Sequence, residues 1–166
     1  AITNKADHVT FDRLVIRNVG GSNAINNAGV EYVSVINSEF TNFVDTGVVM
    51  KGKGKYASLE NCHNVVDNNW FHDFSKPEYW SQAVYVLNSV GASVTHNEFV
   101  NGAHGGITFD ACIDLVIEYN LFDNMMKTTQ DYGAIYTFSI YHLLDAPHAE
   151  ELFRRDYITF TEGKEA

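Results

Sequence analysis

Four side chains that can take part in acid–base or hydroxyl chemistry each stand two positions before one of four similar apolar runs. The runs are GVVM from Gly47, AVYV from Ala83, GITF from Gly106 and GAIY from Gly133, and each opens with a small residue. The polar residues are Asp45, Ser81, His104 and Asp131. If the runs are equivalent strands of one parallel sheet, these side chains form a row with neighbours about 5 Å apart.

His104 and Asp131 are neighbours in this row, and the pair suggests acid–base chemistry. A carboxylate beside an imidazole holds it charged and oriented, and the imidazole in turn tunes the acid. Asp131 is therefore the candidate general acid or base, with His104 as its orienting partner; the alternative is that the row only caps strands at a turn. Asp110 lies at the far end of its strand, roughly 20 Å away. A glycosidase carboxylate pair needs about 5–10 Å, so Asp110 and Asp131 are not expected to act together.

Further outward residues are expected to contact a substrate, because strand side chains alternate between the two faces. The expected outward rows are Val49, Tyr85, Thr108 and Ile135, and then Lys51, Leu87, Asp110 and Thr137. The small residues that open the strands would leave room for a sugar ring close to the backbone. We predict that a substrate contacts Asp45, Tyr85, Thr108, Asp110 and Trp80. Trp80 would share a stacking platform with Tyr79 and Trp70, although Trp70 also suits simple packing.

A repeated unit supplies the elements that would position these residues. Val94–Asn101 reads VTHNEFVN, Val116–Asn124 reads VIEYNLFDN, and further copies begin at Leu14, Val33 and Val65. Repetition in a fixed order indicates a solenoid. The expected interior column is Val19, Phe40, Phe71, Phe99 and Phe122. The polar column before it is Arg17, Ser38, Asn69, Asn97 and Asn120, where asparagine suits left-handed turns and hydrogen bonds to the next coil.

The sequence therefore predicts an all-β protein, a right-handed parallel β-helix of about five coils over residues 1–138. The inward residues of the second strand are expected to be Val48 and Met50, Val84 and Val86, Ile107 and Phe109, and Ala134 and Tyr136. The last pair shifts by one if Ile135 faces inward instead. Residues 139–166 are expected to form a tail or cap, in which Ala146–Arg155 has helix chemistry, with its proline and acids early and its arginines late. Such a helix, further β-helix coils or partner chains would cover an open end.

Charge and composition exclude several classes of function. A formal net charge of −10 argues against nucleic acid as a partner. No apolar stretch is long enough to span a membrane, and none of the histidines has metal-ligand spacing, so no metal and no cofactor are expected. Cys62 and Cys112 fall two coils apart, about 10 Å, which predicts buried free thiols. No signal peptide is visible, and the chain is either a mature protein or a piece of a longer one.

The run from Asn37 to Thr137 resembles bacterial right-handed β-helix proteins allied to glycoside hydrolase family 141. The matching pieces are TGVVMKG, NVVDNNWFHDFS, GASVTHNEFVNGAHGGITF, IEYNLFDN and DYGAIYT. The resemblance implies a β-helix that acts on plant or host polysaccharide outside the cell or at its surface, with activity of the fucosidase or xylanase type. Of the acidic positions in the family pattern, the one in DYGAIYT carries over to Asp131, and Gln130 stands at the neighbouring acidic position.

Three functions remain open at this point. The first is a glycoside hydrolase that uses carboxylate acid–base catalysis on a polysaccharide. The second is a non-catalytic β-helix module that binds glycan or forms a structural part of a larger extracellular protein. The third is a polysaccharide lyase, which would want a basic residue and calcium among acids, and only Lys51 stands in the outward rows. A second carboxylate near Asp131 would separate the first function from the second.

Overall fold

A computed structural model describes residues 1–75, 81–128, 132–137 and 159–160, and these residues form three parallel sheets. Sheet A is six-stranded, and its strands in spatial order are β1 (Ile2–Asn4), β4 (Asn23–Ala28), β7 (Thr46–Lys51), β10 (Gln82–Val90), β13 (Gly105–Ile113) and β16 (Ile135–Thr137). Neighbouring strands of sheet A are therefore three strands apart in the chain. This is the order expected of a solenoid in which each coil adds one strand to each of three sheets.

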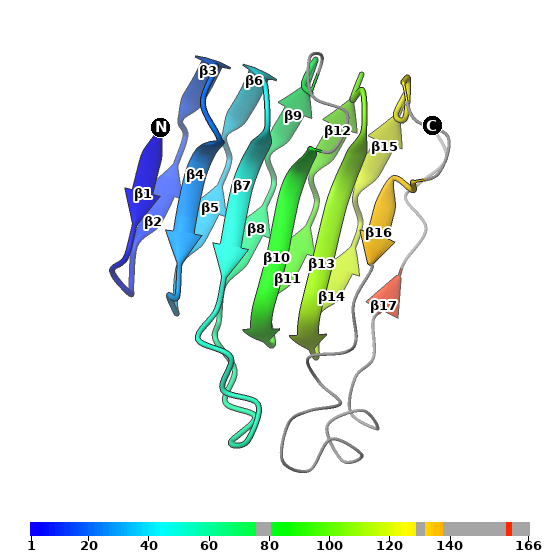
Figure 1. Cartoon of the computed structure of the whole chain (residues 1–166). Helices are drawn as coiled ribbons and strands as arrows, with labels where there is room; N and C mark the ends of the chain where they lie inside the picture. Colours follow the sequence, from blue (N-terminus) through cyan, green and yellow to red (C-terminus); the bar gives the residue numbers. More distant parts are fainter. Residues whose placement is uncertain (76–80, 129–131, 138–158, 161–166) are drawn as a thin grey trace.

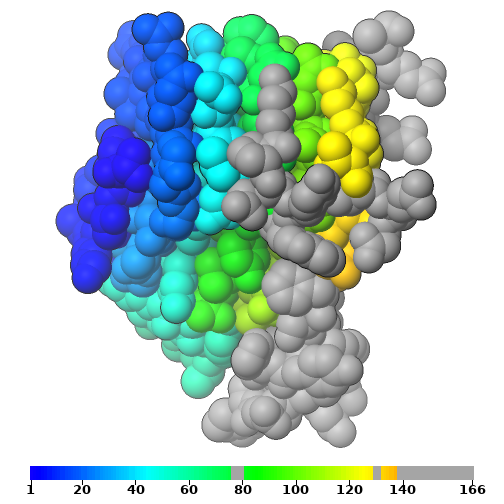
Figure 2. Space-filling model, turned by 45° about the horizontal axis from the view of Figure 1, so that its top comes forward, coloured from blue at the N-terminus to red at the C-terminus, as the bar shows by residue number. Residues whose placement is uncertain are grey.

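Sheets B and C supply the other two sides of each coil. Sheet B contains β2 (Thr10–Asp12), β5 (Ser34–Ile36), β8 (Val65–Asp67), β11 (Ser93–Thr95), β14 (Val116–Glu118) and β17 (Thr159–Phe160). Sheet C contains β3 (Val15–Val19), β6 (Glu39–Phe43), β9 (Trp70–His72), β12 (Glu98–Val100) and β15 (Leu121–Asp123). The chain winds from A to B to C and then into the next coil, which makes a right-handed parallel β-helix of about five coils (Figure 1). The space-filling view shows the coils as successive bands (Figure 2).

Stacked phenylalanines fill the interior beside sheet C, as the repeat predicts. Phe40, Phe71, Phe99 and Phe122 lie in register on neighbouring strands, with ring centroids 4.7, 5.1 and 4.9 Å apart. In the first coil Ile16, not Val19, pairs with Phe40, and Val19 pairs with Phe43. The predicted alignment of this coil was wrong by three residues, because its copy has Leu14 and Ile16 where the others have a polar ladder residue and a phenylalanine.

The turn between sheets B and C uses two adjacent residues for two different tasks. The first residue has a left-handed backbone, with φ of 52° to 57° at Arg13, Asn37, Asn68, His96 and Tyr119. The second points inward, and its side-chain oxygen accepts a bond from the backbone N–H one coil earlier, at Ser38, Asn69, Asn97 and Asn120. The predicted inter-coil ladder is confirmed, whereas the left-handed residue is the one before it. Leu14, not Arg17, holds the ladder position in the first coil.

The register of sheet A confirms three of the four predicted inward pairs and shifts the last. Val84 pairs with both Val48 and Ile107, and Val86 pairs with both Met50 and Phe109. In β16, Ile135 pairs with Ile107 and Tyr136 with Thr108, so Ile135 takes the inward place and Tyr136 the outward one. The prediction that Ala134 and Tyr136 face inward was wrong, because the longer apolar side chain fills the interior better.

The glycines that open the sheet A strands are required by the packing of the interior. A Cβ on Gly47 would meet the rings of Phe43 and Phe71 at 3.1 and 3.2 Å, and one on Gly106 would meet Phe122 at 2.6 Å. The backbone N–H groups of Gly106 and Ile107 both donate to the carbonyl of Ala134, at 2.9 and 3.0 Å, which marks a β-bulge. The expectation that these glycines make space for a sugar outside was therefore wrong, since they make space for the phenylalanine column.

Several predictions fall outside the described residues, among them the helix over Ala146–Arg155 and the boundary at residue 138. Within the expected tail, β17 pairs with β14 and continues sheet B. Cys62 and Cys112 are buried and not linked to each other, which confirms the prediction of free thiols.

Candidate functional site

His104 is buried at the start of β13, at the edge where the chain enters sheet A. Its Nδ1 lies 2.7 Å from the carbonyl oxygen of Ser81, and the ring is 0% exposed. Because a carbonyl can only accept, Nδ1 carries a proton and donates it. The ring is held in one orientation, with its centroid 3.9 Å from that of Tyr132. Sequence reasoning predicted an oriented His104, and the orienting contacts are a carbonyl and a tyrosine.

The row that contains His104 continues into Tyr132. The ring of Tyr132, one position beyond the predicted Asp131, lies directly against the ring of His104. The Tyr132 hydroxyl lies 2.7 Å from Oγ1 of Thr108, and its ring stacks on Tyr136 with centroids 3.9 Å apart. Burial raises the pKa of the Tyr132 phenol. Asp131 and Trp80 lie outside the described residues.

Tyr85 and Asp110 belong to the outward rows of sheet A, as predicted. Tyr85 pairs with both Val49 and Thr108 and is half-buried. Burial raises its phenolic pKa, and the nearby charge of Asp110 raises it further. Asp110 is only 9% exposed, and in the described part of the chain its Oδ1 is buried without a hydrogen-bond partner. A buried carboxylate oxygen in this state offers an acceptor to a hydroxyl-bearing ligand.

The predicted residues do not all come together. Asp110 lies five residues beyond Gly105 along β13, whereas His104 and Tyr132 lie at the opposite end of the strands. Asp45 precedes β7, two strands from β13, and accepts a hydrogen bond from Oγ1 of Thr46 at 3.3 Å. Sheet A therefore carries His104 and Tyr132 at one end, Tyr85, Thr108 and Tyr136 in one row across the middle of the strands, and Asp110 two residues farther along β13.

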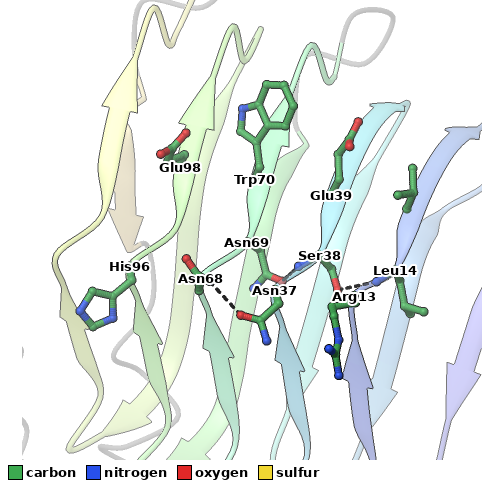
Figure 3. Close-up of a pocket in the computed structure, with 11 residues that line it drawn as sticks. Arg13, Leu14, Asn37, Ser38, Glu39, Asn68, Asn69, Trp70, His96 and Glu98 are labelled. Atoms are coloured by element: carbon green, nitrogen blue, oxygen red, sulfur yellow. Dashed lines mark hydrogen bonds between the residues drawn. The ribbon is translucent and has the colours of Figure 1, made fainter.

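A second feature lies at the edge between sheets B and C, and sequence reasoning did not identify it as a site. A groove of about 470 Å³ runs along this edge. Trp70, Glu39 and Glu98 project from three neighbouring strands of sheet C, with Asn37, Asn68 and His96 on the turn side (Figure 3). Trp70 is 43% exposed. The signal was present in the sequence: Phe71 faces inward, so the residue before it must face out.

The described residues contain no candidate metal site and no membrane-spanning helix. Over these ranges no group of three or more His, Cys, Asp and Glu side chains is placed to hold a metal ion. The same part of the chain has no helix of the length and hydropathy needed to cross a bilayer.

Comparison with known proteins identifies a family and nothing finer. The model of the family described as "Right handed beta helix region" matches residues 1–140. No curated protein and no solved structure matches the chain. The match bears on the β-helix and does not extend to glycoside hydrolase family 141. The chain belongs to the right-handed β-helix family.

Proposed function

We propose that this right-handed β-helix protein is a glycoside hydrolase, which holds a polysaccharide against the outward face of sheet A and cleaves its glycosidic bonds. The observation that carries the proposal is the cluster of Tyr132, Tyr136, His104 and Thr108 on that face. Tyrosine rings offer flat apolar surface to a sugar ring, and their hydroxyls hydrogen-bond to its hydroxyl groups.

A glycan on this face would also reach Tyr85 in the same row as Thr108 and Asp110 two residues farther along β13. Tyr85 lies beside Thr108, and Asp110 has a buried carboxylate oxygen whose acceptor capacity is unused in the described residues. A linear polymer that crosses from the tyrosine cluster to Asp110 would satisfy that oxygen with a hydroxyl. The tyrosine cluster and Asp110 would then act as separate subsites for one extended chain.

Asp131 is the proposed general acid or base. It directly precedes Tyr132 in the chain, and it is the one position where the family 141 pattern carries over as an acid. His104 is the proposed positioning residue, because the bond from its Nδ1 to the Ser81 carbonyl fixes the orientation of its ring. Kinship with glycoside hydrolase family 141, a polysaccharide partner and an extracellular location are part of this proposal.

A non-catalytic glycan-binding or structural module is the second candidate, and one observation favours it. Among the described residues of sheet A, Asp45 precedes β7 and Asp110 lies far along β13, so these two carboxylates are at opposite ends of the strands. Hydrolysis needs two carboxyl groups about 5–10 Å apart. The module needs no such pair, because rings and hydrogen bonds suffice for binding.

Turnover by the Asp131→Asn variant separates the two candidates. We expect turnover to fall at least about 100-fold with glycan affinity nearly intact, because general acid–base catalysis contributes roughly that factor. Asp123→Asn, at an exposed position of β15, controls for the loss of one negative charge. Equal turnover in the Asp131→Asn variant and the parent would remove Asp131 from the mechanism. A parent that binds glycan without turning it over would establish the module.

A further inference from the structure

We infer that the groove between sheets B and C is a separate binding site for a neutral glycan, with Trp70 as its stacking surface. The site lies on a different side of the coil from sheet A and shares none of its residues. It therefore does not depend on the function proposed above, and it would serve a hydrolase or a binding module equally.

The floor of the groove is set by the register of sheet C. Trp70 pairs with Glu39 on one side and Glu98 on the other, so the three side chains occupy one row on neighbouring coils. Coils repeat about every 4.8 Å, which places the two glutamate backbones roughly 10 Å apart with the indole between them. The groove extends from Arg13 in the first coil to His96 in the fourth, roughly 14 Å along the solenoid axis. This length suits an extended chain of sugar rings.

Trp70 is held ready for a ligand and not merely left outside. Its ring stacks on His72 at 3.8 Å between centroids with 21° between planes, while 43% of the residue is exposed. His72 is itself held by Glu39 at 3.3 Å, Asp73 at 3.0 Å and Thr41 at 3.3 Å. A ring fixed in this way loses little conformational freedom when a ligand binds, which favours affinity.

The turn side of the groove adds hydrogen-bonding groups at the coil spacing. Nδ2 of Asn68 donates to Oδ1 of Asn37 at 2.8 Å, and Nδ2 of Asn37 donates to Asp12 at 2.8 Å. Each amide has two N–H groups and two lone pairs, so these bonds leave capacity for a ligand. The same bonds align both amides, and hydroxyls spaced along a sugar chain would meet them in turn.

The charges in the groove select the ligand. Glu39 and Glu98 are acceptors for hydroxyl groups and repel anionic sugars. The cation at one end, Arg13, is paired with Asp12 at 2.7 Å. The formal net charge of −10 over the whole chain also repels anionic sugars. Polyuronates and sulfated glycans are therefore disfavoured, and a neutral hexose or pentose polymer fits.

The surface is poorly suited to docking another protein through apolar contact. The exposed apolar side chains of this row, Val15, Trp70 and Leu121, alternate with Glu39 and Glu98 and form no continuous patch. Protein interfaces need a larger contiguous apolar core. An isolated indole between hydrogen-bonding groups instead matches the apolar face and the hydroxyl rim of a sugar ring.

Affinity electrophoresis of the full chain, followed by calorimetry, tests the inference. The probes are soluble mixed-linkage β-glucan, xyloglucan and galactomannan as neutral polysaccharides and polygalacturonate as the anionic one. We expect binding to at least one neutral probe and a loss of at least about tenfold in affinity for Trp70→Ala, because a stacked indole in a polar groove dominates such a site. Trp70→Phe should retain part of the affinity. Leu121→Ala, in the same row and also exposed, is the matched control and should bind as the parent does.

Two results would overturn the inference, namely unchanged binding by Trp70→Ala, or binding to polygalacturonate in preference to every neutral probe. Tyr85→Ala on sheet A distinguishes this site from the one proposed above. Loss of binding in Tyr85→Ala with none in Trp70→Ala would refute the groove and leave sheet A standing. Loss of binding in Trp70→Ala with none in Tyr85→Ala would support the groove and count against sheet A. Circular dichroism confirms that each variant is folded, and Trp70→Phe provides the test if Trp70→Ala is not.

Discussion

At the B–C turn, the role of an asparagine depends on which of the two turn positions it occupies. Nδ2 of Asn97 donates to the carbonyl of Val66 at 3.0 Å, the carbonyl of Thr95 at 2.8 Å and Oδ1 of Asn120 at 3.0 Å. Its Oδ1 accepts from the backbone and side chain of Asn69. Asn68 has a left-handed backbone and bonds to Asn37 at the surface. The inward asparagine connects coils, and the outward one makes the turn.

Asn97→Ala should destabilise the fold by about 3 kcal/mol, because it leaves several buried groups without partners. Asn68→Gly should cost less than about 1 kcal/mol, because glycine accepts the left-handed backbone and the bond that is lost is exposed. Urea unfolding followed by circular dichroism measures both. Similar costs for the two variants would contradict the division of tasks at this turn.

The position of a candidate residue could be predicted from the sequence only where it depends on the strand that contains the residue and not on the register between coils. Asp110 and Tyr85 follow from strand alternation alone. The ring packed against His104 depends on the register of the next coil, which shifted by one because Ile135 and Ala134 compete for one interior place. Trp70 was left open because an indole beside a phenylalanine column suits packing as well as exposure. Alternation from Phe71 decides the question in favour of exposure.

At the scale of elements, the phenylalanine stack is the main contact between coils on the sheet C side. Phe99 is fully buried between Phe71 and Phe122, whereas Phe122 is only partly buried. Phe99→Ala should therefore cost about 3–5 kcal/mol, and Phe122→Ala clearly less. Chemical denaturation with fluorescence detection measures the difference. If Phe122→Ala proved as costly as Phe99→Ala, partial burial would be a poor guide to packing in this column.

Tyr56 is one of the residues that attach the loop between β7 and β8 to the solenoid, beside the ion pairs of Lys53 with Asp7 and Lys55 with Glu31. The Tyr56 hydroxyl donates to the carbonyl of Ala111 at 2.6 Å, and its ring packs with Leu59 against Val90 and Ile113. Burial raises the pKa of the Tyr56 phenol above its usual value of 10.0, and the nearby thiol of Cys112 and the carboxylate of Asp110 raise it further. The folded state therefore keeps this phenol protonated at a pH where the unfolded chain has lost the proton.

Tyr56→Phe tests this attachment through stability and its pH dependence. At neutral pH the variant should lose about 1 kcal/mol, which is typical of one hydrogen bond. In the parent, the stabilisation linked to this phenol is complete below pH 10 and declines as pH rises above it, because only the unfolded state ionises there. The parent should thus lose more stability between pH 9 and 11 than Tyr56→Phe, as measured by thermal unfolding. Parallel pH profiles would show that Tyr56 does not titrate differently in the two states.

The five-coil architecture followed from the repeat, while the first and last coils did not align correctly. The central copies carry both an asparagine and a phenylalanine, so each confirms the register of the others. The first copy has Leu14 and Ile16 at these positions, and neighbouring apolar residues of the sequence fit the repeat equally well. Glycines were also misread, because Gly47 and Gly106 face phenylalanine rings that come from other strands.

At the scale of the whole molecule, each strand pairs only with strands of the neighbouring coils, so protection against unfolding should depend on position. β8 and β9 have strands paired on both sides, whereas β1, β2 and β3 are edge strands of the three sheets in the described structure. In an array of this kind stability is roughly a sum of nearest-neighbour terms. Native-state hydrogen exchange should find the slowest amides in the central coils and faster exchange in β1 to β3. Uniform protection throughout would indicate one cooperative unit.

The three corners of the coil differ in how much chain they accept. Between sheets B and C the connection is two residues in every coil, from Arg13–Leu14 to Tyr119–Asn120. The connection from A to B varies, with residues 29–33 in one coil and 52–64 in the next, and the connection from C to A varies as well. The asparagine ladder explains the difference, because an inserted residue would break its bonds to both neighbouring coils.

The length of the connection can therefore vary at the A–B and C–A corners, whereas the B–C corner always has two residues and repeats at the spacing of the coils. Loop grafts and affinity tags would be tolerated at residues 52–61 and would fail at 96–97. The same asymmetry makes the third corner a molecular ruler, where outward side chains repeat at a fixed interval and can be redesigned one rung at a time to match the period of a chosen polymer.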